Sequence, residues 1–248
     1  MCWKHLTHVA GCIGGSGKAS GGAYCGICPF CRFMIGKVLD ENGDGNIEDM
    51  RNGVEWVIQN REKYRVRVLN ISIGIGHIEN KEKMRELIEA VDRAWDSGIV
   101  VVCAAGNMGP EPMTISPLGA SKKVITVGCH DGGYFSGKSS LCENYSGRGP
   151  SPYAVKKPDV VAPGTDILSC NVACRVTFRG YRNAYIAKSG TSMATPIVAG
   201  AAALLLQKYP ELSNEQVKRK INFSATDLRE SWTKQGWGMI NIKKLLTG

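Results

Sequence analysis

The 248-residue sequence lacks an apolar run long enough to cross a membrane: the longest candidate, residues 197–206, falls well short of roughly 18 residues. The start of the chain has neither the apolar core nor the cleavage site of a secretory signal peptide. Its 30 glycines follow no period, and no internal repeat occurs. These absences exclude a membrane-spanning, collagen-like or repeat protein and favour a globular domain.

Charge and cysteine content narrow the possible partners and compartment. The net charge of +9 raises the possibility of an anionic partner, but acidic residues are interleaved with the basic ones and no arginine-rich arm occurs. We therefore expect neither a nucleic-acid nor a membrane partner. We also expect the chain to be a monomer. The ten cysteines are too sparse for a small disulfide scaffold, and Cys103 and Cys129 lie in apolar strand patterns. Reduced thiols predict a cytoplasmic protein, with secretion as the alternative.

Apolar segments of strand length alternate with segments of helical period, which predicts parallel strands joined by helices. Strands are expected at residues 33–39, 67–76, 99–106 and 123–129, and helices at 47–64, 81–97 and 192–209, with two shorter helices after these. Residues 134–185 are rich in glycine, serine and proline and predict loops and short strands. The pattern indicates one α/β domain spanning residues 1–248.

Two loops resemble ligand-binding motifs but lack an essential residue. GGSGKAS at residues 14–20 resembles a phosphate-binding loop, yet Cys12 occupies the first glycine position and Ala19 the hydroxyl position. Residues 40–51 resemble a calcium-binding EF-hand loop, yet Arg51 stands where the bidentate glutamate belongs. We interpret both segments as ordinary turns.

Cysteines and histidines raise the possibility of a metal. CGICPFC at residues 25–31 has the start of an iron–sulfur spacing without its fourth cysteine, and free thiols are the simpler interpretation. His5 and His8 in HLTHVAG are about one helical turn apart and could both reach a zinc ion. However, the pair lacks the glutamate of the metalloprotease motif. We therefore predict no metal-binding residues.

Two polar residues stand where acyl-transfer chemistry would need them. Ser192, in KSGTSMATPIVAG, lies between a glycine-bearing loop and a long apolar helix. Amides at a helix N-terminus favour a developing anion, so Ser192 could be a nucleophile or simply a helix N-cap. Asn107 follows a buried strand in CAAGNMGP, where its amide could donate to an oxyanion or stabilise a turn. At this point both alternatives stay open.

Five stretches occur in a fixed order: HLTHVAG, LNISIG, AAGN, KPDVVAPGT and SGTSMATPIVAGAAALL. In this combination the chain resembles the subtilisin-type serine proteases, or subtilases, from about His5 to its end. The resemblance implies an α/β, subtilisin-like three-layer fold with a mostly parallel central sheet flanked by helices. It also implies a serine endopeptidase that hydrolyses peptide or protein substrates through an acyl-enzyme and requires no cofactor for the chemistry.

By the same resemblance, Ser192 is the nucleophile, His5 the general base, and Asn107 an oxyanion donor beside the backbone amide of Ser192. His8 is then structural. Elementary chemistry agrees, because acyl transfer needs a hydroxyl, a base with a pKa near neutrality and donors for the oxyanion. The residues that the resemblance assigns to substrate binding are Ser72, Ile73, Gly74, Ala104, Ala105 and Gly106. It also matches Ser116–Pro117 to a cis-proline turn.

The chain departs from the family pattern around its histidine. The family's catalytic aspartate precedes the histidine by some tens of residues, whereas only MCWK precedes His5 here, and no residue is named as the triad acid. We therefore expect an N-terminally truncated domain whose sheet has an unpaired edge or an apolar gap. Its activity should be severely reduced, with an inactive peptide-binding remnant as the alternative. Lys4 and Leu6 replace the glycines that usually flank the histidine. A structural calcium ion is possible in the family, but residues 15–25 offer few acidic or amide ligands and do not support one here.

Overall fold

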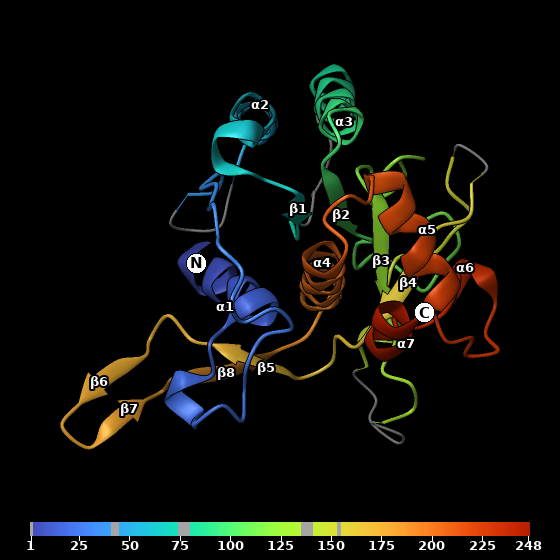
Figure 1. The fold of residues 1–248 in the computed structure, drawn as a ribbon. Coiled ribbons are helices and arrows are strands. Elements are labelled where there is room, and N and C mark those ends of the chain that lie inside the picture. Colours follow the sequence, from blue (N-terminus) through green and yellow to red (C-terminus); the bar gives the residue numbers. More distant parts are fainter. Residues whose placement is uncertain (1, 41–44, 74–79, 135–140, 153–154) are drawn as a thin grey trace.

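The computed structural model describes residues 2–40, 45–73, 80–134, 141–152 and 155–248. Figure 1 shows its elements in chain order. They are α1 (Cys2–Gly14), α2 (Ile47–Tyr64), β1 (Val68–Ile71), α3 (Lys81–Asp96), β2 (Val100–Ala104), β3 (Ile125–Cys129), β4 (Val160–Ala162), β5 (Ile167–Cys170), β6 (Arg175–Thr177), β7 (Gly180–Arg182), β8 (Tyr185–Lys188), α4 (Thr191–Lys208), α5 (Asn214–Ser224), α6 (Trp232–Gln235) and α7 (Ile242–Thr247). Short 3₁₀ turns lie at Lys18–Ser20 and Cys142–Asn144.

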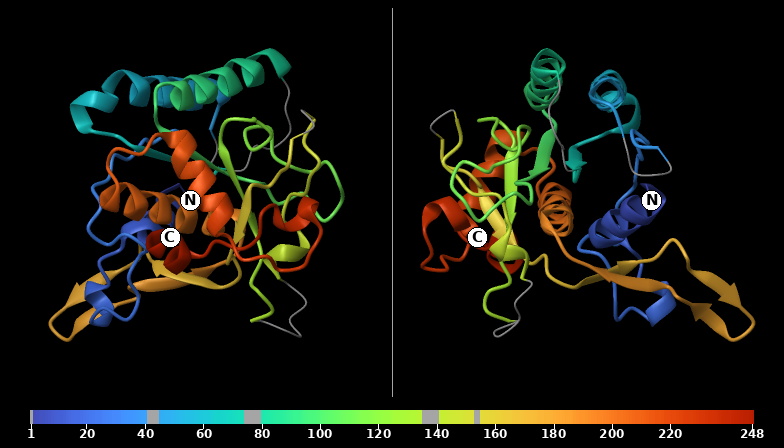
Figure 2. Two further views of the ribbon diagram at one scale, coloured as in Figure 1. Left: turned by 45° about the vertical axis from the view of Figure 1, so that its right-hand side comes forward. Right: turned by 180° about the vertical axis from the view of Figure 1, so that it is seen from behind.

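A parallel four-stranded sheet in the order β1-β2-β3-β4 forms the middle of three layers. Helices α2 and α3 pack together on one face, and α1 and α4 pack together on the other, as the views in Figure 2 show. Every residue of β2 and β3 is buried, as parallel strands covered on both faces require. The predicted α/β architecture, three layers with a parallel central sheet flanked by helices, is confirmed.

Local signals explain why the helices begin where they do. The side chain of Asn46 accepts a hydrogen bond from the Asp49 amide at the start of α2, and that of Asn80 caps α3 in the same way. In α3 the buried side chains recur every three or four residues, which gives the helix one apolar stripe toward the sheet. These side chains are Met84, Leu87, Ala90, Val91, Ala94 and Trp95.

The strand predicted at residues 33–39 is wrong, because the structure forms no strand there. Residues 32–37 are exposed, and within the described residues their backbone takes part in no ladder. An apolar cavity of about 850 Å³ separates this segment from β1, the edge strand of the sheet. A strand requires a partner at hydrogen-bonding distance, and the cavity lies where that partner would be.

The proline turn expected at Ser116–Pro117 is also wrong in its peptide geometry. The cis peptide bonds of the described chain precede Pro110, Pro150 and Pro158 instead. At Ser116, the hydroxyl donates to the carbonyl of Ala104 at 2.6 Å and the amide to that of Ala105 at 2.7 Å. These bonds fix the turn against the end of β2 with a trans peptide bond.

A buried ion pair joins β3 to β4. Lys157 is 1% exposed, and its ammonium donates to the Val124 carbonyl at 2.8 Å, the Thr126 hydroxyl at 2.8 Å and the Asp159 carboxylate at 2.7 Å. Burial lowers the pKa of Lys157 to about 8, although the Asp159 charge opposes that shift. Asp159 also accepts a hydrogen bond from the Thr126 amide. The pair therefore ties neighbouring strands at their amino ends.

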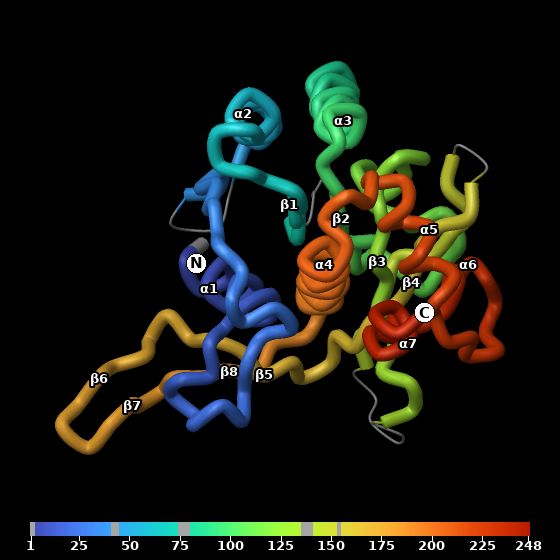
Figure 3. Tube along the Cα trace, in the orientation of Figure 1, coloured from blue at the N-terminus to red at the C-terminus, as the bar shows by residue number. Residues whose placement is uncertain are grey.

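Smaller elements extend from this body. Strands β5 and β8 pair antiparallel beneath α1, and Figure 3 shows the β6–β7 hairpin projecting beyond them. After α4, the structure forms α5 and α7 as the two predicted short helices, with the four-residue α6 between them. Among the described residues, no helix combines the length and the apolar character that crossing a membrane requires.

Candidate active site

Ser192 is the second residue of α4 and not its cap. The N-cap is Gly190, whose φ of 143° falls in a region that residues with L side chains rarely adopt. No side chain accepts a capping hydrogen bond at this position. Ser192 keeps 9% of its surface exposed. The helix-cap alternative for Ser192 is therefore excluded, and its backbone amide lies among the unpaired donors of the first turn.

Asn107 lies beside the N-terminus of α4, where its side chain contacts Thr191, the residue before Ser192. Its Oδ1 accepts hydrogen bonds from the Thr191 amide at 3.1 Å and from the Thr191 hydroxyl at 3.0 Å. Thr191 is fully buried, so both donors are fixed. Because its oxygen is occupied, the carboxamide of Asn107 has its two N–H donors left to offer. Gly190 lies close by, since a Cβ there would be 3.6 Å from the Asn107 Nδ2.

His5 is a partly buried residue of α1 that contacts the end of β1. Its Nε2 lies 2.8 Å from the carbonyl oxygen of Ser72, to which it donates. Burial lowers the pKa of His5, the Ser72 carbonyl raises it in part, and the charge of Lys188 lowers it further. Lys188 donates in turn to the carbonyl of Lys4 at 2.7 Å. The surroundings therefore favour the neutral imidazole, the form that can accept a proton.

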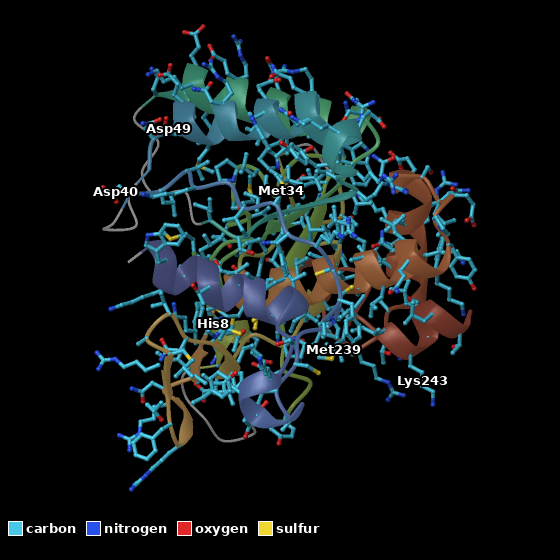
Figure 4. All side chains as sticks on the ribbon, turned by 60° about the vertical axis from the view of Figure 1, so that its left-hand side comes forward. His8, Met34, Asp40, Asp49, Met239 and Lys243 are labelled. Atoms are coloured by element: carbon cyan, nitrogen blue, oxygen red, sulfur yellow. The ribbon has the colours of Figure 1, made fainter. Side chains whose placement is uncertain are left out.

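His8 has the structural position expected of it. It is fully buried on α1, labelled in Figure 4, and its Nε2 lies 2.9 Å from the Ile167 carbonyl and 3.1 Å from the Ile186 carbonyl. These contacts fasten α1 to the β5–β8 pair. The thiol of Cys12 lies 3.7 Å from the other ring nitrogen. Within the described residues, no group of three or more histidine, cysteine or acidic side chains is arranged to hold a metal ion.

Some predicted partners are not joined by a hydrogen bond. None connects His5 to Ser192 in the part of the chain that the structure describes, because His5 is turned toward Ser72. The pKa of His5 is shifted by burial, by the Ser72 carbonyl and by the charge of Lys188, and no described carboxylate contributes to that shift. The ring must leave Ser72 before its Nε2 can meet the Ser192 hydroxyl.

The residues assigned to substrate binding flank the same end of the sheet. Ser72 directly follows β1, and its hydroxyl accepts a hydrogen bond from the side-chain Nδ2 of Asn70 at 2.9 Å. Ala104 ends β2, and Ala105 after it is fully buried. The remaining assigned residues are Ile73, which is partly buried, Gly106, whose φ is 92°, and Gly74, which lies outside the described residues.

Two contacts of the site connect residues that no short motif joins. Thr191, 84 positions after Asn107, contacts it, and Lys188 contacts Lys4, 184 positions earlier.

Arg51, which stands where a calcium loop would have its bidentate glutamate, forms an ion pair with Glu86 between α2 and α3. Arg51 is thus part of a helix–helix contact.

Comparison with known proteins identifies clear relatives. A family model described as the subtilase family matches residues 2–238. Serine protease AprX of Bacillus subtilis (strain 168) is 37% identical over 98% of this chain and 58% of its own length, and subtilisin E of the same strain is 37% identical over 97% and 55%. The chain thus spans little more than half of these curated relatives.

Two solved structures have the same fold over nearly the whole chain. Sphericase superposes with a TM-score of 0.78 and 25% identity, over 96% of this chain and 77% of its own. The prenylagaramide maturation protease PagA gives a TM-score of 0.74 and 28% identity, over 98% of this chain and 81% of its own. These superpositions support the overall fold described above.

Proposed function

The chain belongs to the subtilase family, and from that membership we propose that it is a serine endopeptidase with Ser192 as nucleophile and His5 as general base. The observation that carries the proposal is the contact between Asn107 and Thr191 at the N-terminus of α4. It holds the Asn107 carboxamide, whose N–H donors have no acceptor among the described residues, beside Ser192 at a helix N-terminus. A site of this kind suits a reaction in which an oxyanion develops on a carbonyl oxygen.

The proposed reaction proceeds in two halves. The Ser192 hydroxyl oxygen attacks the scissile carbonyl carbon, His5 takes the hydroxyl proton, and the negative charge forms on the carbonyl oxygen. The Asn107 amide and the Ser192 backbone amide donate to that oxyanion. His5 then gives its proton to the leaving amine, and the C–N bond breaks to leave an acyl-enzyme. Water, deprotonated by His5, hydrolyses the ester and restores Ser192.

The surroundings of His5 favour its role as a base, but they do not hold its ring in a fixed orientation toward Ser192. A lowered pKa keeps the imidazole neutral at pH 7, so that it can accept a proton. However, no described carboxylate supports the ring or stabilises the imidazolium that would form. In subtilisin, loss of the aspartate costs about 3 × 10⁴ in kcat. We therefore expect slow hydrolysis from these 248 residues taken by themselves.

Substrates are proposed to be peptides or proteins, bound as an extended segment beside Ser72 and Ile73 with one side chain between these residues and residues 104–106. The chemistry described above needs no cofactor. Residues 1–248 would form one catalytic domain that acts as a monomer. Its cytoplasmic location and the absence of a nucleic-acid partner remain predictions.

A second candidate function is peptide binding without turnover. The observation that favours it is the His5 ring, which is bonded to Ser72 and has no described acidic partner. Hydrolysis of a fluorogenic peptide by the purified chain separates the two functions when it is compared with His5→Ala and Ser192→Ala. Slow turnover that both substitutions abolish supports the endopeptidase. Peptide binding with no turnover in any of the three proteins supports the second candidate, and equal turnover in all three contradicts the assignment of both residues.

A further inference from the structure

The β6–β7 hairpin carries positive charge that no acidic residue nearby in the sequence balances. Arg175, Arg179 and Arg182 lie within it, and no acidic residue occurs between Asp166 and Glu211. Among the described residues, the ion pairs that arginines form lie on α2 and α3. We expected no membrane partner because acidic and basic residues are interleaved, and this segment is an exception to that pattern.

The two faces of the hairpin differ in character. In its antiparallel register Arg175 lies directly opposite Arg182, and Val176 lies directly opposite Tyr181. Because successive side chains of a strand point to opposite faces, the arginine pair lies on one face and the apolar pair on the other. Like charges directly opposite each other, about 5 Å apart, repel. An anionic partner beside the arginine pair would remove that repulsion.

The apolar side chains of the hairpin are exposed. Phe178 is 93% exposed and Val176 is 78% exposed, and Tyr181 on the neighbouring strand is also exposed. The guanidinium carbon of Arg179 lies 5.2 Å from the centre of the Phe178 ring. Single apolar side chains on a protein surface are ordinary, whereas three on one short segment beside cations indicate a contact surface.

The hairpin projects from a base that is fixed to the rest of the molecule. Figures 2 and 3 show its tip beyond the other elements. At the base, β5 pairs with β8, the Tyr185 ring packs edge-on against Tyr24 at 5.2 Å, and the Tyr185 hydroxyl donates to the Ser20 hydroxyl at 3.0 Å. The tip could therefore meet a broad surface while the three layers of the domain stay in water.

The spacing of the side chains along the hairpin fits a bilayer surface. Apolar side chains of interfacial segments lie roughly 5–10 Å deep, at the boundary between headgroups and acyl chains. Arg175 precedes Phe178 by three residues, which corresponds to about 10 Å along a strand. With Phe178 at that depth, the arginine pair lies at the level of the lipid phosphates, to which guanidinium groups donate hydrogen bonds. A convex, projecting end fits such a fluid surface better than it fits an extended peptide, which needs a groove or a strand edge.

From these observations we propose that the β6–β7 hairpin docks, tip first, on the surface of a bilayer that contains anionic phospholipids. Phe178 and Val176 enter the interface, and the arginines pair with lipid phosphates. Strand β8 leads from the hairpin to α4, so docking places the N-terminus of α4 on the side of the domain nearer the bilayer. This binding needs neither Ser192 nor His5, and it goes beyond the proposed function.

The test is co-sedimentation of the whole 248-residue chain with vesicles. The chain carries Ser192→Ala, so that it cannot cleave itself. Vesicles of equal parts phosphatidylserine and phosphatidylcholine are compared with vesicles of phosphatidylcholine alone. We expect binding to the anionic vesicles that weakens as salt is added, and no measurable binding to the neutral ones. Amide hydrogen exchange at residues 175–182 should become slower when the anionic vesicles are present.

A charge variant tests the arginines. Arg175→Gln combined with Arg182→Gln should weaken binding to the anionic vesicles roughly thirtyfold, since each arginine near an anionic surface changes the partition constant about fivefold. Lys63→Gln combined with Arg219→Gln removes the same charge from exposed positions on α2 and α5 and should leave binding nearly unchanged.

An apolar variant tests the tip. Phe178→Asp should weaken binding roughly tenfold or more, because it removes the ring from the interface and adds a charge that the lipids repel. Phe30→Asp, at a position that is 94% exposed, is the matched control and should bind as the parent chain does. Circular dichroism should show that each variant is folded, since all the changed side chains are exposed.

The proposal is overturned if the chain does not sediment with the anionic vesicles or binds the neutral ones equally well. It is also overturned if the hairpin variants bind as tightly as their controls. Binding of soluble polyglutamate without sedimentation on vesicles would assign the hairpin to an acidic polypeptide and would overturn it in the same way.

Discussion

At the scale of single residues, the amide of Asn107 depends on Thr191. The carboxamide could rotate by 180° about its Cβ–Cγ bond, which would exchange its oxygen and nitrogen. Two Thr191 donors, the amide at 3.1 Å and the hydroxyl at 3.0 Å, hold the oxygen and so determine where the N–H donors point. Thr191 is thus a positioning residue for the proposed oxyanion donor.

Thr191→Val removes one of these donors and keeps the shape of the side chain. We expect kcat/KM for a peptide substrate to fall about fivefold to tenfold, because one hydrogen bond contributes about 1 kcal/mol. KM should change less than kcat, since the bond acts on transition-state charge. Thr191→Ser restores the hydroxyl and should recover most of the activity. Full activity in Thr191→Val would show that Asn107 does not need this contact.

The charge of Lys188 has a measurable effect on His5. Because Lys188 lowers the pKa of His5, Lys188→Met should raise that pKa and move the acidic limb of the kcat/KM profile to higher pH. Activity at pH 6, relative to the plateau, should therefore fall. Arg182→Met, an exposed change on β7, is the control and should leave the limb in place. An acidic limb that stays fixed or moves to lower pH in Lys188→Met would contradict this arrangement.

Short motifs were sufficient to predict Ser192, His5 and Asn107 as candidates. They could not reveal Thr191 or Lys188, whose relevant contacts span 84 and 184 positions. They also could not exclude a helix cap at Ser192, because the position of the cap depends on the backbone of Gly190.

At the scale of elements, the accuracy of prediction follows how local each signal is. Helices predicted at 47–64 and 81–97 match α2 and α3 within one residue, because asparagine caps and apolar periodicity lie inside or next to each helix. The strand predicted at 33–39 fails, since apolar content alone does not supply a ladder partner. A strand is a property of a pair of segments.

The contact between β3 and β4 can be tested through Lys157. Lys157→Met should lower the free energy of unfolding by about 3–5 kcal/mol, because it leaves the Asp159 carboxylate buried without its nearest counter-charge. Lys156→Met, an exposed change one residue earlier, is the control and should have little effect. Urea unfolding measures both. Unchanged stability in Lys157→Met would contradict the role assigned to Lys157. It would mean that Lys218, whose ammonium lies 3.3 Å from the same carboxylate, compensates fully for the lost charge.

At the scale of the whole molecule, the layered fold gathers distant residues at one edge. Ser72 follows β1, Asn107 lies three residues beyond β2, and Ser192 lies in the first turn of the helix that packs across these strands. Parallel strands place their carboxyl ends together, so the alternation of strands and helices already predicts such a gathering. The sequence predicted an unpaired edge or an apolar gap in the sheet, whereas the residues that line the cavity beside β1, and the buried Asn70 Oδ1 that has no hydrogen bond, emerge only from the assembled structure.

The central claim is that Ser192 is a nucleophile activated by its surroundings. Labelling the folded chain with a fluorophosphonate and mapping the adduct by mass spectrometry tests it most directly. We predict one adduct, on the peptide that contains Ser192, present in the control Ser189→Ala and absent in Ser192→Ala. An adduct of equal yield in Ser192→Ala, or none in the wild-type chain, would contradict the claim.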